Sequence, residues 1–390
     1  MRVFSVPVSV PFLRSVIAAL IDGRLIQGFT ARTDPARLAE ATLYLPTRRA
    51  MRVAREVFLD ELKTDAAILP RIVALGDIDE DELAFAGEAD PFGIAEPLDI
   101  PPKLSELDRR LTLARLVAAW AKGPVLAPLV VGGPASTLAL AGDLGRLMDD
   151  MVTRGVAWDL LDGLVPDQLD PYWQHSLQFL RIARTAWPAF LAEIGKIEPA
   201  ARRDLLISAE AARLGAHHKG PVIAAGSTGS MPATAKFLHA VARLPQGAVV
   251  LPGLDTDLDE ESWQGIGGIG NAQGGFTTLP ASNHPQFAMH ALLDRFGLAR
   301  RDVEILRPPA PQGRDMLLSE TMRPSNATAQ WHDRLGRTEV AAKIAEGMKN
   351  LAVIEAPNPE MEALAVAIPF SSHDSATKAS RWSCAISAKS

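Results

Sequence analysis

The sequence has very little cysteine: Cys384 is the single one in 390 residues. An internal disulfide needs two cysteines and a cysteine-ligated zinc or iron–sulfur site needs several, so the sequence excludes both from this chain. Long apolar runs are also missing, because Gly, Pro or a charged residue interrupts each one before the roughly 20 residues of a membrane span. We therefore expect a cytoplasmic protein that makes no contact with a membrane.

An excess of positive charge is missing as well. The chain carries 40 Lys and Arg against 46 Asp and Glu, a net charge of −6 at pH 7. A protein with this balance has no general electrostatic attraction to nucleic acid. A contact with DNA would therefore depend on a local basic patch.

The motifs of common catalytic and metal sites are absent too. The eight histidines show no HExxH or other zinc spacing, and no Gly-x-Ser-x-Gly turn presents a nucleophile. The acidic segment 255–260 lacks the Gly and Glu that a calcium loop needs at its sixth and twelfth positions. An acidic helix start, favoured by the helix dipole, explains this segment. We expect no catalytic residue and no metal site.

What the sequence does contain is a series of short apolar runs typical of β-strands. Most of them are followed by turn residues and then by a helical pattern, and this alternation predicts an α/β fold with a parallel sheet. The runs lie at residues 2–6, 42–45, 71–75, 221–225, 248–251, 303–306 and 351–354.

The middle of the chain departs from this alternation. From Lys103 to about His218 the pattern is helical almost throughout. Ser105, with Asp108 three residues later, resembles a capping box and predicts the first helix start. The length of this stretch is sufficient for a subdomain with its own core.

The simplest organisation is therefore one α/β domain split by an all-helical insertion. Segments 99–103 and 217–221, which contain Pro, Gly and Lys, are the expected hinges. The Gly-rich segment 264–283 is an expected flexible surface loop. The predicted units are residues 1–100 and 219–350 for the two parts of the α/β domain and 101–218 for the insertion.

Arginines cluster where one predicted strand gives way to a helix. The run at 42–45 ends at a proline, and Thr47 is a good N-cap for the helical pattern that follows. In an open parallel sheet, ligands bind beyond the carboxyl ends of the strands, which is where this helix begins. The cluster is therefore a candidate contact with backbone phosphates, with a structural or subunit-contact role as the alternative. The candidate nucleic-acid-binding residues are Thr47, Arg48, Arg49 and Arg52.

A second candidate site is a loop of small residues between the strand at 221–225 and a helix that Pro232 is expected to begin. Its backbone N–H groups could face a phosphate at the helix N-terminus. No Gly-Lys-Ser/Thr follows, however, so we expect no ATP binding, and a tight strand-to-helix turn is the favoured interpretation. The loop residues are Gly226, Ser227, Thr228, Gly229 and Ser230.

Several of these blocks, taken together and in order, resemble the AddB subunits of bacterial AddAB helicase-nucleases. The resemblance runs through nearly the whole chain to about Ile368. The blocks are LPTRRAMRVAREVF (45–58), LPRIVALGDIDEDEL (69–83), PPKLSELDRRLTLARLVAAW (101–120), GSTGSMPATAKFL (226–238), AVVLPGLDTDLDEESW (248–263) and HPQFAMHALLDRFG (284–297).

The resemblance implies a RecA-like parallel-sheet domain, related to P-loop NTPases, that is split by a helical insertion. Residues 351–368 would open a second, truncated RecA-like domain. It also implies a role in repair of double-strand breaks by homologous recombination, with AddA and DNA ends as partners. The family uses ATP, Mg²⁺ and an iron–sulfur cluster in parts that we do not expect in this chain.

Two functional hypotheses follow. In the first, the chain is an inactivated, helicase-like portion of the subunit that binds DNA ends, with the segment from Thr47 to Arg49 as the backbone contact that the resemblance implies. In the second, it is a protein-interaction scaffold whose arginines dock on AddA and never meet DNA. Because the phosphate-loop Lys and the nuclease domain are missing, we expect no enzymatic activity from this chain alone. A weaker third hypothesis is an enzyme that holds a phosphorylated ligand in the loop at 226–230.

Residues 369–390 differ in composition from the rest of the chain. Seven of these 22 residues are serine, none is Leu, Val, Gly or Glu, and Pro369 interrupts the preceding helical pattern. We predict that this tail is not part of the evolved fold but a non-native or out-of-frame terminus. Translation of the other two genomic frames after the codon for Ile368 should reveal an open frame that continues the family's sequence. Stop codons in both frames would contradict this.

Overall fold

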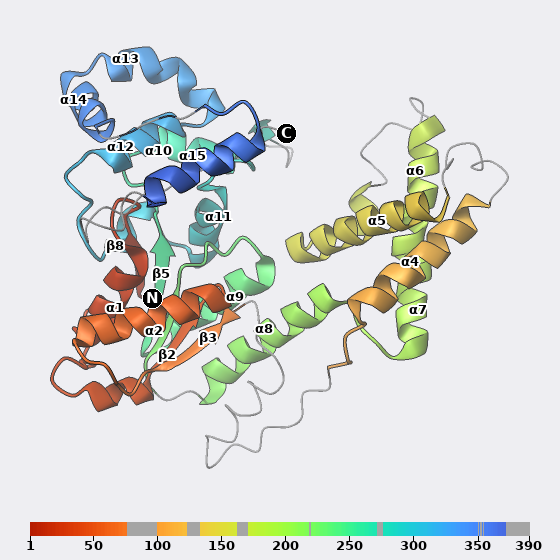
Figure 1. Cartoon of the computed structure of the whole chain (residues 1–390), viewed down its shortest axis with the longest axis horizontal. Helices are drawn as coiled ribbons and strands as arrows, with labels where there is room; N and C mark the ends of the chain where they lie inside the picture. Colours follow the sequence, from red (N-terminus) through yellow and green to blue (C-terminus); the bar gives the residue numbers. More distant parts are fainter. Residues whose placement is uncertain are drawn as a thin grey trace.

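The computed structural model describes residues 1–75, 100–122, 133–161, 171–217, 220–270, 276–349, 351, 353 and 355–371. Its centre is a six-stranded sheet in which every pair of neighbouring strands runs parallel (Figure 1). The strand order is β3-β2-β4-β5-β1-β8. The strands are β1 (Val3–Val6), β2 (Thr42–Leu45), β3 (Arg71–Ala74), β4 (Val222–Ala225), β5 (Gly247–Pro252) and β8 (Glu304–Ile305).

Helices follow most strands and cover both faces of the sheet. Because both faces are covered, the central strands are apolar along their whole length rather than alternating with polar residues. The helices are α1 (Phe12–Ile21), α2 (Arg48–Leu62), α4 (Glu106–Ala121), α5 (Pro134–Arg154), α6 (Pro171–Arg181), α7 (Trp187–Ile194), α8 (Pro199–His217), α9 (Pro232–Arg243), α10 (Glu260–Gly267), α11 (Phe287–Phe296), α12 (Arg314–Thr321), α13 (Trp331–Leu335), α14 (Thr338–Gly347) and α15 (Pro359–Ser371).

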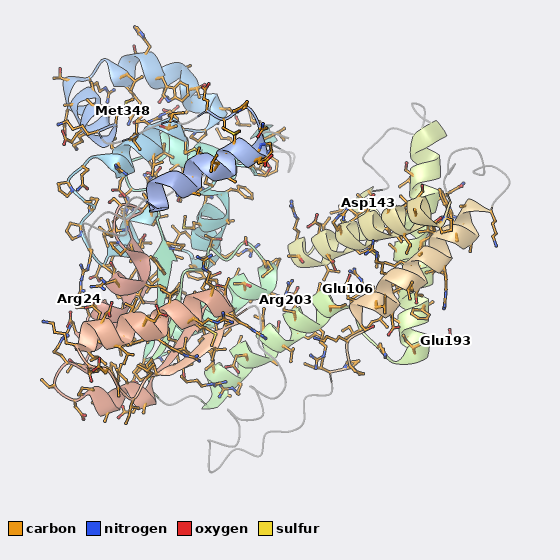
Figure 2. The ribbon with its side chains drawn as sticks, viewed as in Figure 1. Arg24, Glu106, Asp143, Glu193, Arg203 and Met348 are labelled. Atoms are coloured by element: carbon orange, nitrogen blue, oxygen red, sulfur yellow. The ribbon has the colours of Figure 1, made fainter. Side chains whose placement is uncertain are left out.

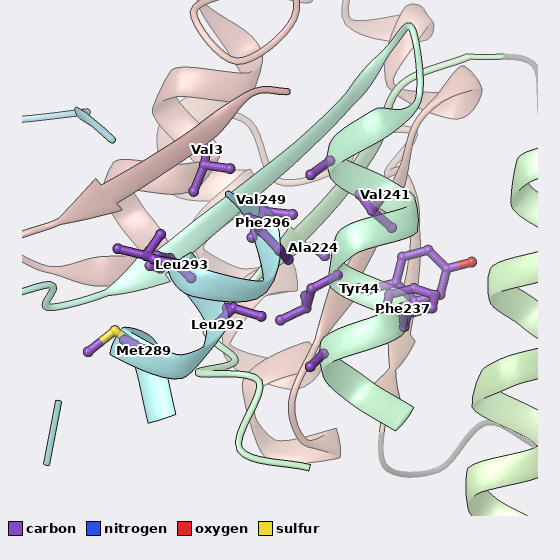
Figure 3. Packing of buried hydrophobic residues seen from close by; sticks show 14 of the residues in the cluster. Val3, Tyr44, Ala224, Phe237, Val241, Val249, Met289, Leu292, Leu293 and Phe296 are labelled. Atoms are coloured by element: carbon purple, nitrogen blue, oxygen red, sulfur yellow. The ribbon is translucent and has the colours of Figure 1, made fainter. Parts of the chain in front are cut away.

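Successive strand residues belong to two different cores because side chains alternate across a sheet. Leu43 packs with residues of α1 and α2 on one face. Tyr44 packs on the opposite face with residues of α8, α9 and α11, and Figure 3 shows this cluster from close by. There Tyr44 and Phe237 meet edge to face with ring centroids 4.9 Å apart.

Between β3 and β4 the described residues are mainly helical. Figure 1 shows α4, α5, α6 and α7 gathered to one side of the sheet, with α8 running between them and the sheet. These helices have a third apolar core, in which Trp187 is 1% exposed. At its border the buried Arg109 reaches Asp149 at 2.9 Å and Glu198 at 2.9 Å. The helices α4 to α7 therefore have a core of their own, and an ion-pair cluster joins α4 and α5 to the residue just before α8.

The helix α8 contributes to the sheet's core through Leu206, Ile207 and Leu214. It also carries Glu210, whose carboxylate accepts hydrogen bonds from the hydroxyl of Tyr44 and from Arg213 Nε at 2.7 Å. Burial, together with the negative charge of Glu210, raises the pKa of Tyr44 above its ordinary range. This buried cluster joins α8 to the strand β2.

The structure confirms the predicted α/β class and the parallel sheet, and six of the seven predicted strands are present. The prediction of a strand at 351–354 is wrong for Leu351 and Val353, which lie outside any strand and are 54% and 88% exposed. An apolar run forms a stable strand only when it pairs with another strand, and Leu351 and Val353 do not pair with one. The other two residues of that run lie outside the described residues.

The Gly-rich segment 264–283 contains regular structure, so the prediction of a loop is wrong for part of it. Helix α10 continues to Gly267, and the short strands β6 (Ile269–Gly270) and β7 (Phe276–Thr278) pair antiparallel. Composition alone hides this hairpin because glycine is the common residue of both tight turns and flexible loops.

Most of the predicted tail lies outside the described residues. Its first residues, up to Ser371, continue the helix α15, so Pro369 does not end that helix. Within the described ranges no helix combines the length and apolar character needed to cross a membrane.

We predict that Glu210→Ala lowers the free energy of unfolding by about 3 kcal/mol, because it leaves the buried Tyr44 hydroxyl and the Arg213 guanidinium without their acceptor. Urea denaturation followed by circular dichroism measures this. The matched control is Glu193→Ala on the exposed surface of α7 (Figure 2), which should cost less than about 0.5 kcal/mol. Equal losses in the two variants would show that the buried cluster is not a stabilising contact.

Candidate nucleic-acid interface at the carboxyl edge of the sheet

The loops that follow the strands lie together, because all six strands point the same way. The turn after β2 and the loop after β4 are in direct contact. A Cβ added to Gly226 would lie 3.3 Å from Cδ of Pro46 and 3.2 Å from Cε1 of Phe12. The structure therefore places the candidate loop 226–230 against the turn that comes directly before the candidate segment 47–52.

The first helical turn after β2 is fixed by its cap. Thr47 is extended, with φ −142° and ψ 157°, and its Oγ1 accepts a hydrogen bond from the backbone N–H of Ala50 at 3.2 Å. This confirms Thr47 as the predicted N-cap. Ala54 and Phe58 are buried on the inner face of α2. Because these residues fix the rotation of the helix, the arginine side falls outward: Arg48, Arg49 and Arg52 are all exposed.

The charge at this helix start is unusual. The first turn of α2 contains no acidic residue, and its arginines lie at the positive end of the helix dipole, where a cation is locally unfavourable. The carboxylates of Asp60 and Glu61, near the other end of α2, pair with Arg14 at 3.0 and 3.2 Å. They are thus not partners of the N-terminal arginines.

The three arginines are not equivalent. Arg48 is engaged by another group of the chain. Within the described part of the chain, neither Arg49 nor Arg52 has a side-chain hydrogen bond or an ion pair. A guanidinium that lacks a partner, on the exposed side of a helix N-terminus, remains available to a phosphate or a carboxylate of another molecule. Arg49 and Arg52 are therefore the strongest candidates among the predicted residues.

The loop after β4 has structural reasons for its glycines. Gly226 and Gly229 have φ values of +87° and +65°, which side-chain-bearing residues rarely adopt. A Cβ on Gly229 would lie 2.8 Å from Cδ1 of Leu292 in α11, and the Gly229 N–H donates to Oγ of Ser227 at 3.3 Å. These contacts favour the tight-turn interpretation over a phosphate site.

The C-terminal end of α5 lies close to the N-terminus of α9, the helix that follows this loop. A Cβ on Gly155, just after α5, would lie 3.3 Å from Cγ of Pro232. Pro232 is the first residue of α9, as predicted. On the same side Arg203 of α8 (Figure 2) donates to Oγ1 of Thr153 at 3.3 Å. The space before α9 is thus partly taken by the chain itself.

The acidic segment after β5 has two different roles. Asp259 caps α10, since its Oδ1 accepts from the N–H of Ser262 at 2.9 Å, as the predicted acidic helix start requires. Burial raises the pKa of Asp259, but the hydrogen bonds from Ser262 and Arg323 outweigh burial and hold this pKa well below its usual range. Asp255 instead folds back on its own loop and accepts from the N–H groups of Asp257 and Leu258, both at 3.0 Å.

Beside this segment lies a cavity of about 230 Å³ that the sequence did not reveal. It opens at the ends of β1 and β5, and the helix α12 closes one side with Asp315 and Ser319. No sequence pattern marks it, because α12 is some sixty residues from the β5 loop and reaches the cavity through the fold. Within the described ranges, no group of three or more His, Cys, Asp or Glu is placed to hold a metal ion.

No protein-family model matches the chain, and the search of curated proteins found no similar sequence.

We predict that Arg49→Gln and Arg52→Gln leave the free energy of unfolding within about 0.5 kcal/mol of the parent, because neither side chain has a partner to lose. The charge reversal Arg49→Glu should raise the free energy of unfolding slightly, because a carboxylate interacts favourably with the positive end of the helix dipole. Thermal denaturation at low salt tests both. Arg14→Gln, which breaks the pairs with Asp60 and Glu61, serves as a variant that should lose stability. A marked loss in Arg49→Gln would assign that residue a structural role.

Proposed function

We propose that this chain is a non-catalytic, DNA-end-binding portion of an AddB-type helicase-nuclease subunit that works with AddA. In this proposal the parallel sheet is a RecA-like domain, and the helices between β3 and β4 are its insertion. The observation that carries the proposal is the pair of exposed arginines, Arg49 and Arg52, at the carboxyl edge of the sheet. We infer the partners, AddA and DNA ends, from the resemblance of the surrounding sequence to AddB proteins.

Local charge is sufficient for such a contact in an acidic protein. Exposed charges separated by more than about 10 Å at 0.1 M salt are largely screened from one another. A phosphate near the start of α2 therefore responds chiefly to the arginines there and to the helix dipole, and much less to the net charge of −6. Such contacts hold the DNA backbone without reading its sequence.

In this proposal the chain does not bind ATP, because the residues at the strand ends do not suit a triphosphate. The segment that follows β1, residues 7–11, contains no Lys and no Gly, so it cannot form a phosphate loop. The neighbouring cavity is lined by Asp255, Asp257 and Asp315, whose carboxylates repel a triphosphate. Unwinding would then be supplied by AddA, and this chain would contribute the scaffold and strand contacts.

We predict that the double variant Arg49→Gln/Arg52→Gln, assembled with AddA, binds DNA ends more weakly on all sequences. Each lost phosphate contact should reduce the slope of log affinity against log salt by about 0.9. Fluorescence anisotropy with a labelled duplex end, measured over a range of salt concentrations, gives both values.

The matched control is Arg243→Gln. Arg243 is an exposed arginine in the last turn of α9, which leads into the start of β5 and so lies at the opposite edge of the sheet. This variant should bind DNA with the parent's affinity and slope. If the double variant also keeps both, the proposal is wrong. If it instead assembles poorly with AddA while DNA binding of the assembled fraction is unchanged, the protein-docking hypothesis holds.

A further inference from the structure

The cavity at the ends of β1 and β5 lies where ligands bind in open parallel sheets. The loops after these strands pack closely: a Cβ on Gly253 would lie 2.4 Å from Cγ1 of Val8. The rest of the wall comes from the segment before α11, with His284, from Pro309, and from α12 and its end, with Asp315 and Ser319. The cavity is thus built from five separate parts of the chain, and it has no role in the DNA contact proposed above.

The cavity wall is rich in acidic side chains and poor in basic ones. Asp255, Asp257 and Asp315 line the cavity, and the described residues of its lining include no Lys or Arg. Burial raises the pKa of Asp257, and the charges of Asp255 and Asp315 raise it further. Lys343 has the opposite effect on Asp257, but its Nζ lies 3.3 Å from a carboxylate oxygen of Glu339.

Both ring nitrogens of His284 are engaged by backbone groups. Its Nδ1 accepts a hydrogen bond from the N–H of Gln286 at 3.1 Å. Its Nε2 lies 2.5 Å from the carbonyl oxygen of Met322.

Among the described residues, two buried polar atoms of the cavity lining have no hydrogen-bond partner. One is Oγ of Ser319, a residue only 4% exposed. The other is Oδ2 of Asp315, whose Oδ1 accepts from the N–H of Ser9 at 3.3 Å. Buried polar atoms are nearly always satisfied, and a carboxylate oxygen without a partner is especially costly. The Asp315 oxygen therefore lacks a hydrogen-bond donor, and the Ser319 hydroxyl lacks a partner of either kind.

Most of the remaining lining residues are apolar, with Val8, Leu254 and Leu318 among them. A volume of about 230 Å³ is several times the roughly 30 Å³ that one water occupies in the liquid. A bare divalent ion would need about six oxygen ligands, and no group of three or more His, Cys, Asp or Glu among the described residues is placed to hold a metal ion. An ammonium or guanidinium group suits the wall better, because it donates several hydrogen bonds and its stem can pack on apolar side chains.

We propose that this cavity binds an organic cation, an ammonium or guanidinium group on an apolar stem, with Asp257, Asp315 and Ser319 as its polar partners. Such a group can come from a small amine or from a basic side chain of a partner protein. The cavity then has the position of a nucleotide site in an open α/β sheet but takes a ligand of opposite charge.

The test is isothermal titration calorimetry of the full chain with agmatine, which carries a guanidinium and an ammonium at the ends of a four-carbon stem. We expect saturable 1:1 binding with a dissociation constant of about 1 mM or lower. Asp257→Asn and Asp315→Asn should each weaken it at least tenfold, and Ser319→Ala severalfold. Ser319→Ala keeps the test valid if an aspartate variant does not fold, because its hydroxyl has no hydrogen bond to lose. The exposed Asp150→Asn on α5 is the control and should bind as the parent does.

Two further titrations complete the test. If agmatine also weakens assembly with AddA, the cation is a side chain of the partner; if assembly is unchanged, it is a small molecule. Magnesium chloride and Mg-ATP should give no binding that agmatine displaces. The proposal is overturned if agmatine shows no saturable binding, if the cavity variants bind it as the parent does, or if Mg-ATP or Mg²⁺ occupies the cavity instead. None of these results bears on DNA binding by Arg49 and Arg52, so the two proposals fail independently.

Discussion

All six strands of the sheet run in the same direction, and this determines where both candidate sites lie. Parallel pairing places the loops after β1, β2, β4 and β5 along one edge, and the strand order decides which of them are neighbours. Two strand spacings of about 4.8 Å separate β2 from β5. The arginine side of α2 and the acidic cavity beside β5 thus begin from strands about 10 Å apart, close to one Debye length at 0.1 M salt. A DNA strand bound at the arginine side of α2 would be repelled by the acidic cavity. One edge of the sheet therefore carries positive charge at one place and negative charge at another.

Buried polar clusters fix the position of the helices relative to that sheet. Glu210 of α8 meets Tyr44 of β2, and at the other end of the same region Arg109 joins Asp149 and Glu198 beside Trp187. A buried charge without its partner is strongly destabilising, so each cluster favours one arrangement over its alternatives. The position of α5 also affects the carboxyl edge of the sheet. Gly155, just after α5, packs close to Pro232 and narrows the space before α9.

Much of the fold was predictable because its signals are local. Short apolar runs marked β1 to β5 and β8, Thr47 and Ser105 capped the helices α2 and α4 as expected, and Pro232 began α9. The hairpin of β6 and β7 was missed because glycine composition does not distinguish a turn from a loop. The acidic cavity was missed for a different reason: Asp257 and Ser319 belong to separate helical and loop segments that meet through tertiary packing alone. The cap at Thr47 was predictable from the sequence, whereas the engagement of Arg48 by another group of the chain was not.

Site-specific photocrosslinking can determine whether the start of α2 touches DNA, as proposed. A photoreactive amino acid replaces Arg49 in the chain assembled with the proposed partner AddA on a labelled duplex end, and the same substitution at Arg243 serves as the reference. We expect a covalent adduct with DNA from position 49 and none from position 243. Adducts from position 49 that contain protein and no DNA would contradict it.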